Sequence, residues 1–118
     1  MTNAGVRMAR VLIGDFNPVM RLGLRELLIE AGCEVVAEDA TDHGDLVDRL
    51  ARSLPDVLVL DLEDEDVARA VSVAFPSIKV IVCATSGESM RIFPRFHRGE
   101  SFATPMSAEN LAEATAEL

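Results

Sequence analysis

The sequence predicts an α/β fold in which a parallel sheet is covered by helices on both faces. Apolar strands alternate with amphipathic helices five times along the 118 residues, and this alternation is typical of parallel sheets that are buried on two sides. Hydrophobic residues make up 49% of the chain, which is enough to form a core in a domain of this length. We therefore expect one domain, residues 1–118.

The first part of the chain gives clear boundaries for its elements. A strand at 9–14 is followed by a helix that Asn17 caps and Pro18 begins. Gly32 ends this helix, since glycine readily adopts the backbone conformation that follows a helix. The next expected elements are a strand at 33–38, a helix at 42–53, a strand at 56–60 and a helix at 65–74.

The last part of the chain is regular except for one segment. A strand is expected at 78–83, and the segment 86–100 should hold a fourth helix. Pro94 falls in the interior of that helix, so the helix must be short, kinked or late-starting. A fifth strand at 101–104 and a last helix that opens at Ser107 complete the pattern.

Polar or small residues follow several of these strands. In a doubly wound sheet the functional crevice lies beyond the carboxyl ends of the strands. The residues that fall at this edge are Asp15, Asp61, Ala84, Thr85 and Thr104. We therefore expect the functional site there.

The run Val57-Leu58-Val59-Leu60-Asp61 and the stretch 11–24 each carry a strand that ends at an acid. In this order and spacing they make the chain resemble the receiver domain of two-component response regulators. The resemblance implies a flavodoxin-like (βα)5 fold, a doubly wound parallel five-stranded sheet of order 2-1-3-4-5. It also implies that Asp61 matches the phosphoacceptor and that Asp15 matches the first acid of a magnesium-binding pair.

Other positions depart from the family pattern. Phe16 stands where the second acid would be, and a phenyl ring cannot coordinate a cation. Ala84, with Thr85 one residue later, takes the place of the Ser or Thr. Thr104-Pro105 matches the family's Lys-Pro, and Lys79, the single lysine of the sequence, enters its strand from the opposite end of the sheet. These departures predict a degenerate pocket, with Phe16 as an apolar plug.

Three functions remain open at this point. The first is an atypical receiver, or pseudo-receiver, that regulates and dimerises without phosphorylation and is not an enzyme. The second is a phosphoacceptor on Asp61 that uses Mg²⁺, held by Asp15 and Asp61, with a histidine kinase as its partner. The third is a small-molecule sensor that binds its ligand in the vacated crevice. A flavin-binding protein is disfavoured, because residues 14–19 lack a Gly/Ser/Thr-rich phosphate loop.

Aromatic and basic residues gather in the region that corresponds to the family's output face. Such residues are enriched in protein interfaces, although the phenylalanines could equally belong to the core. A second candidate interface lies on the first helix, where two apolar residues fall off the core stripe. The interface candidates are Phe93, Phe96, Phe102, Arg91, Arg95, Arg98, Leu22 and Ile29.

Composition restricts the partners and the setting. The net charge of -9 argues against direct binding to nucleic acid. No apolar run is long enough to span a membrane, and Cys33 and Cys83 are expected to be reduced in a cytoplasmic protein. The stretch from Asn17 to Leu24 is similar to receivers joined to a LuxR-type helix-turn-helix. We therefore expect a homodimer in a transcription regulator, with DNA bound by a C-terminal domain absent from this chain and no cofactor required.

Overall fold

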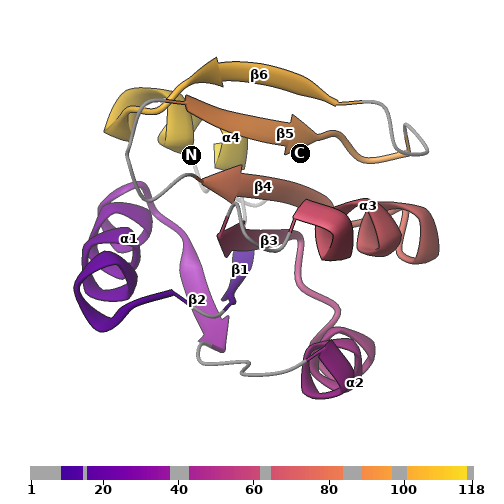
Figure 1. Cartoon of the computed structure of the whole chain (residues 1–118). Helices are drawn as coiled ribbons and strands as arrows, with labels where there is room; N and C mark the ends of the chain where they lie inside the picture. The colour runs from indigo at the N-terminus through magenta and orange to yellow at the C-terminus, as the bar shows by residue number, and fades with distance from the viewer. Residues whose placement is uncertain are drawn as a thin grey trace, which may run out of the picture.

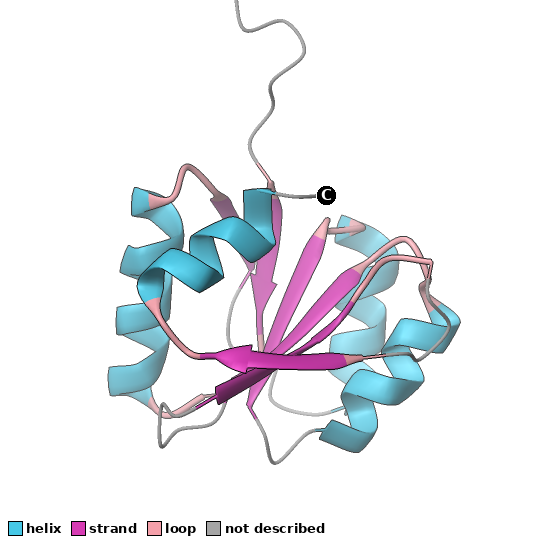
Figure 2. Ribbon diagram, turned by 90° about the horizontal axis from the view of Figure 1, so that it is seen from above, coloured by secondary structure: helices cyan, strands magenta, loops and turns pink. Residues whose placement is uncertain are grey.

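The computed structural model describes residues 9–14, 16–37, 43–61, 65–83, 89–96 and 101–116. These residues form a six-stranded sheet with helices on both faces (Figure 1, Figure 2). The strands are β1 (Arg10–Ile13), β2 (Glu34–Ala37), β3 (Val57–Asp61), β4 (Lys79–Cys83), β5 (Ser89–Phe93) and β6 (Phe102–Pro105). The helices are α1 (Pro18–Glu30), α2 (His43–Ser53), α3 (Glu65–Ala74) and α4 (Ala108–Ala116).

Helix starts and stops agree with the sequence signals. The side chain of Asn17 accepts a hydrogen bond of 2.8 Å from the backbone N–H of Met20, and Pro18 begins α1. Gly32 follows α1 with φ of 89°, a conformation that costs glycine little. Ser107 Oγ likewise accepts from the backbone N–H of Asn110 at 3.0 Å and caps α4.

Two hydrophobic clusters, one on each face of the sheet, form the core. One cluster joins α1 and α4 to the sheet through Leu24, Leu28 and Leu111. The other joins α2 and α3 to the opposite face through Leu50 and Val71 and their neighbours. Successive residues of a strand point to opposite faces, so β3 supplies Val57 and Val59 to the first cluster and Leu58 and Leu60 to the second. The α/β class expected from the sequence is confirmed.

The order of the strands differs from the expected 2-1-3-4-5 of five parallel strands. The sheet has the order β2-β1-β3-β4-β5-β6, and β1 to β4 pair in parallel as expected. However, β5 runs antiparallel to β4, and β6 runs antiparallel to β5. β6 is the strand expected at 101–104, and β5 displaces it outward by one position.

The inserted strand replaces the fourth helix expected within 86–100, and that prediction was wrong over the described residues 89–96. Met90 and Ile92 join the core on the α1/α4 face, whereas Phe93 joins the core on the α2/α3 face. This period of two suits a strand, and pairing with both β4 and β6 stabilises it. Pro94, which lacks a backbone N–H, follows the strand directly.

Candidate functional site

Asp61 lies at the carboxyl end of β3, at the edge of the sheet where the sequence predicts the site. It is partly exposed, and it pairs with Cys83 at the end of β4. β1 ends close by, because Gly14 donates its N–H to the carbonyl of Val59 at 2.8 Å. A Cβ on Gly14 would lie 2.6 Å from Leu60 Cδ2, so the two strands approach closely just before Asp15. Three of the predicted site residues, Asp15, Ala84 and Thr85, lie outside the described residues.

The register of the strands separates Asp61 from Thr104. Asp61 pairs with Cys83, Cys83 with Met90, and Met90 with Thr104, so that the four residues form one row across the sheet. Three interstrand spacings of about 4.8 Å place the two ends of the row about 14 Å apart. The expected order 2-1-3-4-5 would leave only two spacings, about 10 Å. The structure therefore does not bring Asp61 and Thr104 together, and Pro105 lies exposed beyond Thr104.

Phe16 belongs to the hydrophobic core. Its side chain is only 4% exposed, and it is part of the cluster that includes Ile13, Leu24 and Leu111. A phenyl ring in this position offers no oxygen to a cation and excludes water from its surroundings. Phe16 therefore supplies no ligand to a cation at this edge of the sheet. No three His, Cys, Asp or Glu side chains converge as metal ligands within the described ranges.

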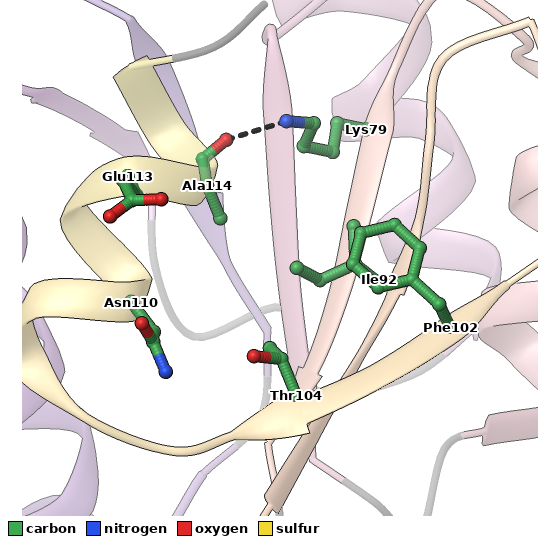
Figure 3. Close-up of a pocket in the computed structure, with 7 residues that line it drawn as sticks. All are labelled: Lys79, Ile92, Phe102, Thr104, Asn110, Glu113 and Ala114. Carbon is green, nitrogen blue, oxygen red and sulfur yellow. Dashed lines mark hydrogen bonds between the residues drawn. The ribbon is translucent and has the colours of Figure 1, made fainter.

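Lys79 lies at the far end of the sheet from Asp61, as the sequence indicates. It begins β4 and pairs with Val57, whereas Asp61 pairs with the last residue of that strand. Its side chain is buried, and Nζ donates a hydrogen bond of 2.7 Å to the carbonyl of Ala114 (Figure 3). Because carbonyls in the last turn of a helix lack partners within the helix, this ammonium caps the end of α4.

Comparisons with known proteins point to one family. No protein-family model matches the chain. The chemotaxis protein CheY of Thermotoga maritima is 27% identical over 112 residues, which cover 89% of this chain and 92% of that protein. CheY of Bacillus subtilis is 23% identical over the same length and coverage. The chain is homologous to CheY, a receiver domain of two-component systems, at low identity. This relationship agrees with the flavodoxin-like arrangement of β1 to β4.

Asp61 also affects the chemistry of its neighbour in the sheet. Its neighbour in β4, Cys83, is fully buried. Burial raises the pKa of the Cys83 thiol from its ordinary value of 9.0 to about 12, and the Asp61 carboxylate adds to the rise. The thiol is therefore protonated and unreactive at neutral pH in the folded protein.

This raised pKa predicts a loss of stability at high pH. Between pH 9 and pH 12 the Cys83 thiol is protonated in the folded protein but ionised in the unfolded chain, so unfolding releases a proton. Below pH 9 the contribution of this thiol to stability is fully present. Within the window we expect the free energy of unfolding to fall by up to about 1.4 kcal/mol per pH unit more in the wild type than in Cys83→Ala. Urea unfolding followed by circular dichroism measures both slopes, and equal slopes would contradict the prediction.

The candidate output surface of this receiver homologue divides into buried and exposed residues. Phe93 is completely buried, whereas Phe96 is 66% exposed and Phe102 is 51% exposed. Leu22 and Ile29 are also exposed, in agreement with their expected place off the core face of α1. Phe93 is therefore a core residue, and the other four remain candidates for an interface.

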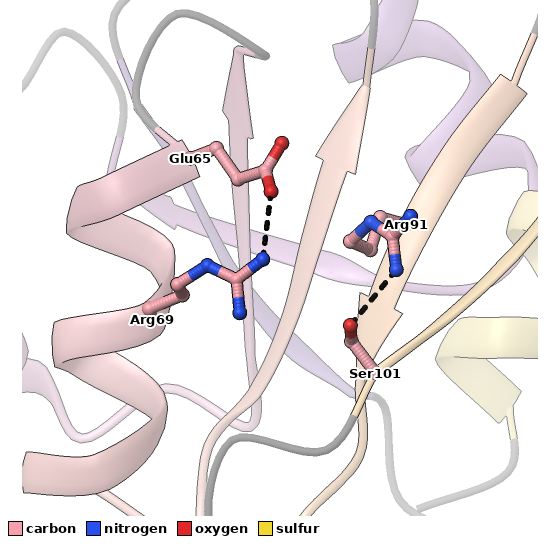
Figure 4. A network of polar contacts seen from close by, with 4 residues as sticks. All are labelled: Glu65, Arg69, Arg91 and Ser101. Atoms are coloured by element: carbon pink, nitrogen blue, oxygen red, sulfur yellow. Dashed lines mark hydrogen bonds and ion pairs between the residues drawn. The ribbon is translucent and has the colours of Figure 1, made fainter.

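The described arginines near this surface contact neighbouring parts of the domain. Arg91 donates a hydrogen bond of 2.9 Å to Ser101 Oγ, and on α3 Arg69 forms an ion pair with Glu65 at 3.0 Å (Figure 4). Arg95 Nε donates to the carbonyl of Ser77 at 2.7 Å, and its guanidinium lies 5.4 Å from the centre of the Phe96 ring. Arg98 lies outside the described residues.

Two features of the structure were not predicted from the sequence. The first is the separation of Asp61 from Thr104 by β5. The apolar residues Met90 and Ile92, two positions apart, were the sequence signal that could have indicated this strand. The second is a cavity beside α4 with both apolar and polar lining residues, where Asn110 and Glu113 are three residues apart and so share one side of the helix. No described helix is long and apolar enough to cross a membrane.

Proposed function

We propose that this chain is an atypical receiver domain that acts as a phosphorylation-independent regulatory and dimerisation module. In this proposal it is not an enzyme and requires no cofactor. It transmits a signal in the cytoplasm to a transcription regulator whose DNA-binding part, of the LuxR type, lies outside this chain. The homology to CheY supports the receiver assignment, and the net charge of -9 favours leaving DNA contact to another domain.

The observation that carries the proposal is the strand inserted between β4 and β6. It separates Thr104, which matches the family's lysine position, from Asp61 by three strand spacings, about 14 Å. A phosphoryl group on Asp61 needs nearby positive charge, because both the attacking carboxylate and the phosphoryl group are negative. Lys79 is held at the other end of the sheet, and Phe16 fills its position with hydrocarbon.

Exposed apolar residues support the dimerisation part of the proposal. Phe102 begins β6 and Phe96 lies shortly after the end of β5, so both belong to the β5–β6 surface. Leu22 and Ile29 lie on α1. Large apolar side chains exposed on a small domain are typical of surfaces that bind other proteins. The β5–β6 surface and the surface of α1 are accordingly the two candidate faces for a homodimer.

A titration with beryllofluoride, a mimic of the phosphoryl group, tests the proposal. We expect no saturable shifts of the amide NMR signals around Asp61 when beryllofluoride and magnesium are added to the wild type. The reason is that the described site offers Asp61 neither a lysine nor a complete set of cation ligands. Transverse relaxation rates from the same samples give the tumbling time, which should correspond to a dimer both with and without beryllofluoride.

The variant Asp61→Asn provides the control, because it removes the carboxylate with almost no change of shape. Saturable shifts in the wild type that vanish in Asp61→Asn would show a working phosphoacceptor that uses Mg²⁺ and would overturn the phosphorylation-independent role. Tumbling as a monomer at all concentrations would overturn the dimerisation role but would not affect the phosphorylation-independent role.

A further inference from the structure

A small cavity lies between α4 and the β5–β6 ribbon, on the α1/α4 face of the sheet. Its volume is about 150 Å³, and residues from β4, β5, β6 and α4 line it (Figure 3). Ile92 and Phe102 form an apolar side. The polar side chains of the lining are Lys79, Thr104, Asn110 and Glu113. The cavity is separate from Asp61, which does not line it and lies at the opposite end of the β3–β4 pairing from the lining residue Lys79.

The inserted strand explains why the cavity exists. β5 widens the sheet by one strand, but α1 and α4 are the helices that cover this face. The described part of α4 has only nine residues and packs against the sheet through Leu111 and Ala114. Asn110 and Glu113 then lie on the side of the helix that faces β6, where the sheet is covered incompletely.

The hydrogen bonds around the cavity determine which ligand chemistry it suits. The ammonium of Lys79 is directed to the carbonyl of Ala114 at 2.7 Å. Asn110 Nδ2 donates to the carbonyl of Pro105 at 2.8 Å, so Oδ1 of this amide is the atom left as an acceptor. The Glu113 carboxylate only accepts, and within the described part of the chain it forms no hydrogen bond or ion pair.

Three groups on the α4–β6 side of the cavity can therefore accept hydrogen bonds, namely the Glu113 carboxylate, Asn110 Oδ1 and Thr104 Oγ. A protonated primary amine has three N–H donors and matches three acceptors. The carboxylate makes such a bond charge-assisted, and the net charge of -9 raises the local concentration of cations and repels anions.

We propose that this cavity binds a small protonated primary amine. Its ammonium group lies among Glu113, Asn110 and Thr104, and its short hydrocarbon chain lies against Ile92 and the ring of Phe102. A cavity of this volume holds a ligand of about six non-hydrogen atoms. Binding does not require phosphorylation of Asp61.

Three probes of nearly equal size, n-pentylamine, n-pentanol and butyrate, test the proposal by amide NMR titration. At neutral pH the amine is protonated and butyrate is ionised, whereas pentanol is neutral. We expect pentylamine to shift signals of β6 and α4 saturably with a dissociation constant of about 1 mM. Pentanol should bind about tenfold more weakly, and butyrate should not bind.

Two charge-neutralising variants on the same helix distinguish amine binding in the cavity from attraction of the amine by the overall negative charge of the protein. Glu113→Gln removes the carboxylate at the cavity, and Glu109→Gln removes one in the first turn of α4 that does not line it. We expect Glu113→Gln to weaken pentylamine binding about tenfold, the effect of losing one charge-assisted hydrogen bond, and Glu109→Gln to change it less than twofold.

Three results would overturn the proposal. They are the absence of saturable shifts with pentylamine, equal weakening in the two variants, and equal affinity for pentylamine and pentanol. Far-UV circular dichroism checks that both variants are folded, and both glutamates are exposed, so the substitutions leave the core intact.

Discussion

Replacing Phe93 with alanine is expected to lower the free energy of unfolding by about 3–5 kcal/mol. Phe93 lies in the inserted strand, is completely buried, and belongs to the core between the sheet and α2 and α3. The guanidinium of Arg69 lies 5.7 Å from the centre of its ring, so the substitution also removes a cation–π contact. Urea unfolding followed by far-UV circular dichroism measures the change, since the chain contains no tryptophan or tyrosine.

Phe96→Ala is the matched control for this prediction. Phe96 is three residues further along the chain and 66% exposed, although Arg95 lies over its ring. We expect the free energy of unfolding to fall by less than about 1 kcal/mol, because removing an exposed ring changes the buried apolar area only slightly. Similar losses for both variants would contradict the placement of Phe93 in the core and with it the pairing of β5. Phe93→Leu, which retains most of the volume, provides a second measurement if Phe93→Ala does not fold.

Phe16→Asp is expected to destabilise the domain by at least about 3 kcal/mol and not to restore a magnesium site. The substitution introduces the acid that the resemblance to receiver domains predicts at this position. However, Phe16 is 4% exposed and lies within the core, so the carboxylate replaces buried hydrocarbon and loses its hydration. Thermal unfolding with and without millimolar magnesium measures both stability and any gain from cation binding.

The variant Phe16→Leu separates the effect of charge from that of shape. It keeps an apolar side chain of similar size and should cost about 1 kcal/mol. A Phe16→Asp protein as stable as Phe16→Leu, or one whose melting temperature rises with magnesium, would show that this position is open to a cation. That result would favour the phosphoacceptor function over the degenerate pocket.

The arrangement of β1 to β4 and the first three helices could be predicted from the sequence, because local signals and tertiary packing agree there. Asn17 and Pro18 begin α1, and uninterrupted apolar runs such as Val57–Leu60 form strands buried on both faces. The segment around β5 was not predicted correctly. Five residues are too few to separate a helix from a strand by periodicity, and pairing with neighbouring strands decided the outcome.

The places of Asp61 and Lys79 in the sheet could be predicted, but the geometry around Asp61 could not. The sequence indicates that Asp61 ends a strand and that Lys79 lies at the opposite end of the sheet, and the structure places both there. The distance from Asp61 to Thr104 could not be predicted, because it depends on how many strands separate them. The cavity beside α4 exists because the extra strand widens the sheet next to this helix. The sequence pattern of α4 alone therefore could not predict it.

The inserted strand also affects the order in which the domain assembles. β6 has β5 as its sheet neighbour and makes no pairing with β4. It can therefore join the sheet only after or together with β5, and the two are close in sequence. Contacts between neighbouring segments have a small loop-closure entropy and form quickly. β5 and β6 thus add to β4 through pairings that are short in sequence, whereas a parallel fifth strand would require a longer crossover connection onto β4.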